Sequence, residues 1–128
     1  MKRSLMQVYV KSSDKAVVFY QKAFDATLLC AYSYDDGTYM HSELDIEGQV
    51  LAVSERNDEN SQNSKETITS NTMQFCLHYG QGNEDKVRRA YEVLKDDAQI
   101  IYPLSECEYS PLMTDLIDKY GVRWCIFI

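Results

Sequence analysis

The sequence predicts an α+β protein made of two β-α-β-β-β modules in tandem, and three observations lead to this prediction. An amphipathic segment, Asp14 to Phe24, lies between two short runs rich in β-branched and aromatic residues. A long polar stretch follows the first set of elements. The same order of elements then returns in the second half of the chain. Because a helix flanked by strands buries its apolar side on a sheet, we expect two mixed sheets with the helices outside.

The first module is expected to occupy residues 1–55. The apolar residues of its helix recur at helical spacing: Ala16, Phe19, Tyr20 and Ala23. Ser12 or Ser13 is placed to cap the start of this helix. The expected strands are Leu5–Val10 before the helix, then Thr27–Tyr34, Tyr39–Ile46 and Gln49–Glu55, with Asp- and Gly-containing turns between the last three.

Residues 56–71 are almost entirely polar, and Ile68 is the one apolar side chain among them. A segment of this composition buries too little apolar surface to join a packed core. We therefore predict a linker between the two modules. Long polar loops also serve as lids over binding sites, and composition alone does not separate the two roles.

The second module is expected to occupy residues 72–128. Its helix follows Asn83, a good N-cap residue, and its apolar stripe consists of Val87, Ala90, Tyr91 and Leu94. The expected strands are Thr72–Tyr79, Ala98–Leu104, Leu112–Ile117 and Val122–Ile128. Gln7 and Gln74 lie early in the two opening strands, which favours a structural repeat over chance similarity.

Composition excludes several classes of function. The chain has 128 residues and a formal net charge of −7, without a cluster of Lys or Arg, which argues against nucleic acids and anionic membrane surfaces as partners. No apolar run approaches the ~20 residues of a membrane span, and no signal sequence is evident, so we expect a cytoplasmic protein. The four cysteines, Cys30, Cys76, Cys107 and Cys125, form no Cys-x-x-Cys pair, and we expect reduced thiols.

Three local segments carry a resemblance to a known superfamily. They are Ala16–Phe24 in the first helix, Met40–Gly48 continuing into Leu51–Glu55, and Asp118–Trp124 before the last strand. With the order of the elements, they make the chain resemble the vicinal oxygen chelate superfamily, which includes glyoxalase I, extradiol dioxygenases and bleomycin-resistance proteins. Within it, the chain looks most like the PhnB-like group. Asp25 departs from the pattern, because the family often has Gly there, and this affects the turn after the helix.

The resemblance implies the glyoxalase/bleomycin-resistance fold, in which each sheet curls so that its inner face lines a cup and its helix packs outside. Strand alternation then assigns side chains to the two faces. We expect Val8, Val10, Met40, Ser42, Leu44, Phe75 and Leu77 to face the helices. We expect Gln7, Tyr9, Tyr39, His41, Glu43, Leu51, Val53, Glu55, Gln74, Cys76, His78, Trp124 and Ile126 to face the cup.

Members of this superfamily that bind a divalent metal take one ligand from the first and last strand of each module, usually His and Glu. The matching positions here are Gln7, Val53, Gln74 and Ile126. Two amides and two aliphatic groups are poor ligands for a transition metal, so we expect no metal cofactor. The alternative is a displaced metal site formed by His41, Glu43, Glu55 and His78, which the face assignment places in the cup.

The expected function is binding of a small organic molecule in the cup, without an assigned reaction. The candidate ligand-binding residues combine amide, imidazole, carboxylate and aromatic groups: Gln7, Tyr9, Tyr39, His41, Glu55, Gln74, His78 and Trp124. The aromatic side chains either form the walls of a pocket or fill the cup. A metal-dependent lyase or dioxygenase with non-standard ligands, and a non-catalytic interaction module, remain as alternatives. The apolar end Trp124–Ile128 predicts a homodimer with the last strand at or near the interface, and the alternative is a monomer in which this strand lies wholly inside the sheet.

Overall fold

The structure is a computed structural model, and it describes residues 1–57 and 72–128. The described residues fall into two compact units. Residues 22–24, at the end of the first helix, group with the second unit rather than with the first. Residues 58–71, nearly all of the predicted linker, lie outside the described residues, so the linker stays a prediction.

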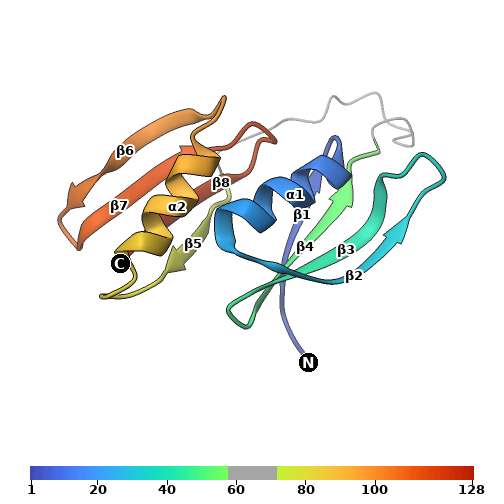
Figure 1. The fold of residues 1–128 in the computed structure, drawn as a ribbon, viewed down its shortest axis with the longest axis horizontal. Helices are drawn as coiled ribbons and strands as arrows, with labels where there is room; N and C mark the ends of the chain where they lie inside the picture. Colours follow the sequence, from blue (N-terminus) through green and yellow to red (C-terminus); the bar gives the residue numbers. More distant parts are fainter. Residues whose placement is uncertain (58–71) are drawn as a thin grey trace. The chain divides into compact units, whose positions relative to one another are not determined.

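The first unit contains one helix and a four-stranded mixed sheet. Its elements are β1 (Met6–Val10), α1 (Ser13–Phe24), β2 (Thr27–Ser33), β3 (Tyr39–Ile46) and β4 (Gln49–Glu55). The strand order is β1-β4-β3-β2, and only the pairing of β1 with β4 is parallel. The second unit repeats this plan, with strand order β5-β8-β7-β6 and a parallel pairing of β5 with β8 (Figure 1). The predicted fold class is therefore confirmed.

One face of the first sheet is covered by helix α1. Val8 and Val10 of β1 are buried, as predicted, and the parallel register places Val8 beside Val53 of β4. Since laterally paired residues point to the same side of a sheet, Val53 also lies on the covered face. Leu44 and Leu51 are paired in the same way and complete this apolar layer. Within residues 1–57, no helix lies on the other face of the sheet, and we call it the first helix-free face.

Helix α1 begins differently from the sequence expectation, because neither Ser12 nor Ser13 caps it with a side-chain hydrogen bond to its own first turn. Instead, the carboxylate of Glu55 accepts hydrogen bonds from the Ser12 and Ser13 backbone N–H groups, at 3.1 and 2.8 Å, and from the Ser13 hydroxyl at 2.8 Å. A carboxylate is favoured there by the unpaired N–H groups and by the helix dipole. The end of β4 thus holds the start of α1.

The elements of the second unit are β5 (Phe75–His78), α2 (Glu84–Leu94), β6 (Gln99–Cys107), β7 (Ser110–Ile117) and β8 (Arg123–Phe127). Val87, Ala90 and Leu94 of α2 are buried, as the helical spacing predicted, whereas Tyr91 is only half-buried. Its ring lies 5.8 Å from the ammonium of Lys95. The amide of Asn83 donates to the Tyr79 carbonyl at 2.8 Å and does not cap α2.

The closing strand β8 lies inside its sheet, between β5 and β7. Trp124 is fully buried, and its ring packs against Phe75, 5.5 Å away between centroids. The indole N–H donates to the carboxylate of Asp118 at 2.9 Å. The other oxygen of Asp118 accepts from the backbone N–H groups of Tyr120 and Val122, so a single buried carboxylate shapes the β7–β8 turn.

Strands β2 and β6, each at one edge of its sheet, pair irregularly with their neighbours. The register of β2 against β3 shifts at two points, and that of β6 against β7 shifts at three. Such bulges bend a strand and increase its local twist. Both outer strands also carry exposed apolar side chains, among them Leu29 and Tyr32 on β2 and Ile101 on β6.

Candidate functional site

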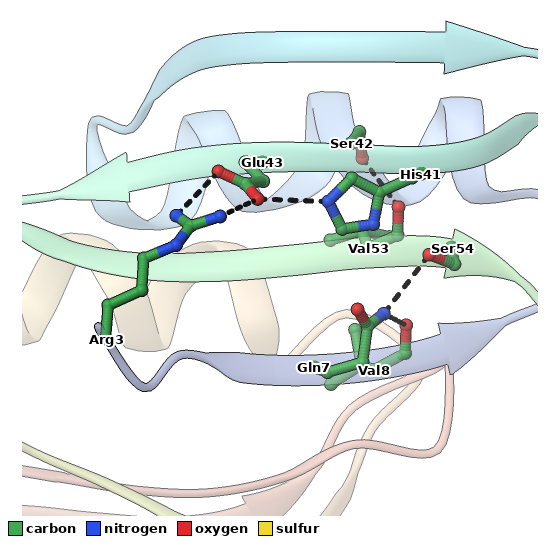
Figure 2. A network of polar contacts seen from close by, with 8 residues as sticks. All are labelled: Arg3, Gln7, Val8, His41, Ser42, Glu43, Val53 and Ser54. Carbon is green, nitrogen blue, oxygen red and sulfur yellow. Dashed lines mark hydrogen bonds and ion pairs between the residues drawn. The ribbon is translucent and has the colours of Figure 1, made fainter. Parts of the chain in front are cut away.

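A polar network lies on the first helix-free face, and Figure 2 shows it from that side. The guanidinium of Arg3 donates two hydrogen bonds to the carboxylate of Glu43, at 3.0 and 2.7 Å. One oxygen of Glu43 also lies 3.0 Å from Nε2 of His41. Hydrogen bonds from Arg3 and His41 lower the pKa of Glu43 to about 2. Glu43 is therefore ionised at neutral pH, and its carboxylate is already engaged by Arg3 and His41.

Gln7 lies on the same face, on strand β1. Its amide nitrogen donates to the Val8 carbonyl at 3.0 Å and to the Ser54 hydroxyl at 3.2 Å (Figure 2). Two tyrosines lie on the same face as these polar groups. Tyr9 is two residues after Gln7 in β1 and is paired with Ser54 of β4, and Tyr32 of β2 is paired with His41 of β3. Their exposed fractions are 63% and 61%, so their rings extend beyond the polar network. Together they offer flat apolar surface beside hydrogen-bonding groups.

The second sheet carries a related arrangement on its own helix-free face. Arg123 donates to both oxygens of Asp115, at 3.1 and 2.8 Å, and this raises the pKa of Arg123. The amide of Gln74 donates to Asp115 at 2.8 Å. Each face thus carries an Arg–carboxylate pair and a glutamine from the opening segment of its module. This agreement supports the repeat inferred from the positions of Gln7 and Gln74.

Aromatic groups extend along the same face of the second sheet. The ring of His78 stacks on Phe127, with 4.5 Å between centroids and 11° between planes. Tyr109 meets Phe127 edge-on at 5.4 Å, and its hydroxyl lies 3.7 Å from Sγ of Cys125. The contact with Cys125, together with partial desolvation of the hydroxyl, raises the pKa of Tyr109. The phenol therefore stays protonated at neutral pH.

The predicted ligand-binding residues divide between the two sides of the sheets. Five lie on helix-free faces or directly before the strands that form them: Gln7, Tyr9, His41, Gln74 and His78. Tyr39 is half-buried at the start of β3, and a register shift against β2 separates it from His41, so its predicted place on the face of His41 does not follow from the pairing. The predicted position of Glu55 is wrong, because it holds the start of α1 on the covered face. The predicted position of Trp124 is also wrong, because it is buried on the covered face beside Phe75. Whether any of the eight contacts a ligand stays a prediction.

These two errors have one cause, a one-residue error in the closing strands. Leu51 and Val53, expected in the cup, lie on the covered face, and Ala52 and Ser54 replace them on the helix-free face. In β8 the covered residues are Trp124 and Ile126, both of which were expected in the cup, and Arg123, Cys125 and Phe127 take the helix-free face. A shift of one residue exchanges the two faces of a strand.

Several residues of the two networks were not in the predicted ligand-binding set: Arg3, Glu43, Ser54, Tyr109, Asp115, Arg123 and Cys125. Asp115 and Arg123 had a visible signal, because each is a charged residue within an otherwise apolar strand. Charges in such strands are buried only when they are paired. Arg3 gave no such signal in the sequence, since it precedes the first strand.

The four residues that the resemblance assigned to metal ligands do not fit a metal ion. The amides of Gln7 and Gln74 donate hydrogen bonds to protein groups, and the aliphatic Val53 and Ile126 lie on covered faces. The predicted convergence of His41, Glu43, Glu55 and His78 is wrong, because Glu43 and Glu55 lie on opposite faces of one sheet. Within residues 1–57 and 72–128, no group of three or more His, Cys, Asp or Glu side chains could hold a metal ion.

The described residues form two four-stranded mixed sheets, each with one helix, and comparison with solved structures finds the glyoxalase/bleomycin-resistance fold that the sequence predicted. The chain is similar to a PhnB protein from Bacillus cereus, with a TM-score of 0.76, 21% identity and coverage of 98% of both chains. It is also similar to a glyoxylase/bleomycin resistance protein/dioxygenase domain from Frankia sp., with a TM-score of 0.69, 13% identity and coverage of 100% of this chain and 97% of that one.

A more distant similarity is to FosX, a fosfomycin resistance protein from Listeria monocytogenes that was solved with Mn(II) and a dihydroxypropylphosphonic acid. The TM-score is 0.61 at 12% identity, over 98% of this chain and 87% of that one. At these identities the similarity concerns the fold. No protein-family model matches the chain, and no protein of curated function matches it. None of the helices in the described residues is long and apolar enough to cross a membrane.

Proposed function

We propose that this chain is a PhnB-like protein that binds a small planar or amphipathic organic molecule on its helix-free sheet faces, without the metal ligands usual in the superfamily. The observation that carries the proposal is the pair of exposed rings, Tyr9 and Tyr32, beside the Arg3–Glu43–His41 network. Exposed apolar surface that is bordered by polar groups is typical of ligand-binding grooves and interaction sites. The similarity in fold to a PhnB protein supports the assignment to that group.

The chemistry of the face favours a ligand with a flat apolar part and at least one hydrogen-bonding group. The tyrosine rings offer stacking surface and hydroxyl groups. Glu43 has its charge matched by Arg3 within the protein, so a cationic ligand gains little there. His41 is half-exposed and its ring offers a polar edge to the ligand. The proposal therefore specifies recognition by stacking and hydrogen bonds rather than by net charge.

The test is a ligand-observed NMR screen of small aromatic and amphipathic fragments against the full chain. We expect a subset to bind, and we expect Tyr9→Ser and Tyr32→Ser each to weaken that binding about two- to tenfold, the range for one aromatic contact. Tyr34→Ser is the matched control, because Tyr34 is an exposed tyrosine that follows β2. Equal losses in all three variants, or no binding fragment, would contradict the proposal.

Metal analysis separates this function from that of a metal-dependent lyase or dioxygenase. FosX was solved with Mn(II), whereas the positions that the resemblance assigns to metal ligands here carry two amides engaged in hydrogen bonds and two aliphatic side chains. We expect protein purified without chelator to contain no stoichiometric transition metal. A bound metal that disappears when His41 and His78 are both replaced by Ala would overturn the proposal in favour of the metal-dependent alternative.

A further inference from the structure

Two cysteines that are far apart in the sequence become neighbours in the second sheet. Cys76 of β5 and Cys125 of β8 are direct partners in the parallel pairing of these strands. Paired residues point to the same side, and Cys125 is also paired with Asp115 of β7, so both thiols lie on the second helix-free face. The sequence predicted reduced thiols because it contains no Cys-x-x-Cys pair, and spacing alone could not reveal this juxtaposition.

The separation of the two backbones suits a disulfide. Neighbouring strands lie ~4.7–4.9 Å apart, which falls within the Cα separation of ~4.4–6.8 Å found across disulfides. The remaining cysteines are placed differently. Cys30 belongs to β2 of the first sheet, and Cys107 ends β6, where it is paired with Ser110. Register thus singles out Cys76 and Cys125 as direct strand partners.

The two thiols differ in access and in surroundings. Cys76 is exposed, and its thiol donates to the amide oxygen of Gln74 at 3.7 Å. Cys125 is buried, which raises its pKa, and its sulfur lies 3.7 Å from the hydroxyl of Tyr109. An oxidant in solution therefore reaches Cys76 first. Cys125 is held beside it, where little movement is needed for a second reaction.

We propose that Cys76 and Cys125 form a reversible disulfide when the protein meets a peroxide. The Cys76 thiol gives its proton to solvent, and the resulting thiolate sulfur attacks one oxygen of hydrogen peroxide. The O–O bond breaks, the departing hydroxide takes a proton from solvent, and sulfenic acid and water result. The sulfur of Cys125 then attacks the sulfenic sulfur, its proton goes to the departing hydroxyl, and a second water leaves as the S–S bond forms. Both sulfurs are oxidised and the peroxide is reduced. This inference does not depend on the proposed function.

The experiment is titration of the chain with hydrogen peroxide, followed by alkylation of free thiols in denaturant and tryptic mapping without reductant. Trypsin places the four cysteines on separate peptides, because Arg56, Lys86 and Arg123 lie between them. We expect the number of free thiols to fall from four to two and the Cys76 peptide to be linked to the C-terminal peptide. Dithiothreitol should restore all four thiols.

Cys76→Ser is the informative variant, since Cys76 is exposed and its replacement leaves the core intact. We expect this variant to form no internal disulfide, whereas the control Cys30→Ser should form the same link as wild type. The proposal is overturned if Cys76→Ser still loses two thiols through a Cys107–Cys125 link. It is equally overturned if wild type accumulates sulfinic acid on Cys76 with no linked peptide.

Discussion

Glu43 links the polar network of the first sheet to pH. Arg3 and His41 lower its pKa from 4.5 to about 2, which means that folding favours the ionised form. The stabilisation is therefore fully present above about pH 4.5 and is lost as the pH falls toward 2. We expect wild type to exceed Glu43→Gln in free energy of unfolding at neutral pH, and this difference to shrink as the pH falls through that window.

Urea titrations of both proteins across the same pH range provide the measurement. The control is Glu47→Gln, which changes an exposed carboxylate in the β3–β4 turn of the same sheet. If the difference in free energy of unfolding between wild type and Glu43→Gln stays constant with pH, then Arg3 and His41 do not stabilise the ionised carboxylate in the folded protein.

Trp124 combines ring packing with one polar contact, and substitutions can separate the two. Trp124→Ala should destabilise by ~3–5 kcal/mol, the range for removing a buried aromatic side chain. Trp124→Phe keeps most of the ring but removes the N–H group that donates to Asp118, and should cost ~1–3 kcal/mol. Denaturant midpoints give both values. The control is Tyr9→Ala, which removes an exposed ring and should change stability by less than ~1 kcal/mol. A near-native midpoint for Trp124→Ala would contradict the burial of Trp124.

At the scale of elements, strand β4 and helix α1 are joined through Glu55. Removal of its carboxylate leaves the N–H groups of Ser12 and Ser13 without their acceptor, so Glu55→Ala should cost ~1–2 kcal/mol, as the loss of a helix cap does. Circular dichroism with urea titration measures this cost, and Glu47→Ala serves as the control. The affinity for bound fragments should not change. A fall in affinity at unchanged stability would instead restore the role in ligand binding that the sequence predicted for Glu55.

The sequence predicted the order and type of the elements because hydrophobic periodicity determines both. It also predicted the faces of β1 correctly, since Val8 and Val10 alternate with the polar Gln7. The closing strands could not be assigned in this way. In β4, Leu51, Ala52 and Val53 are all apolar, so alternation does not distinguish the two faces. Pairing with β1 sets the register there, and register is a property of the assembled sheet.

The arrangement of the site had a similar limit. His41 and Glu43 alternate along one strand, so sequence placed both on the same face, and the structure joins them at 3.0 Å. Arg3 could not be found, because the direction of a segment before the first strand leaves no periodic signal. Long-range partners such as Asp115 and Arg123 become visible only when the strand order is known.

At the scale of the whole molecule, the sequence predicted a homodimer through an exposed apolar terminus. The expected exposure is wrong, because β8 is an inner strand and Cys125 and Ile126 are buried. Phe127 is half-buried on the helix-free face, between His78 and the exposed Tyr109. We therefore propose that the homodimer forms through the aromatic cluster of Phe127, His78 and Tyr109.

Sedimentation at micromolar concentration tests the dimer. Wild type should sediment as a dimer, Phe127→Asp as a folded monomer, and Val18→Asp, which changes an exposed apolar residue of α1, as a dimer. A monomeric wild type would contradict the homodimer. A folded and dimeric Phe127→Asp would exclude this aromatic cluster from the interface.

The irregular pairing of β2 and β6 has a consequence for behaviour in a crowded cell. An outer strand with apolar side chains such as Leu29 and Ile101 is a template on which another chain can add, and growth of that kind leads to fibrils. Addition of such a chain requires a regular row of accessible backbone N–H and C=O groups along the edge strand. The register shifts in both strands interrupt that row, so an incoming chain can match only a few hydrogen bonds before it loses alignment. We therefore expect the irregularities to hinder strand addition at these two edges, whereas β1 and β5, at the opposite edges of the two sheets, pair in regular register.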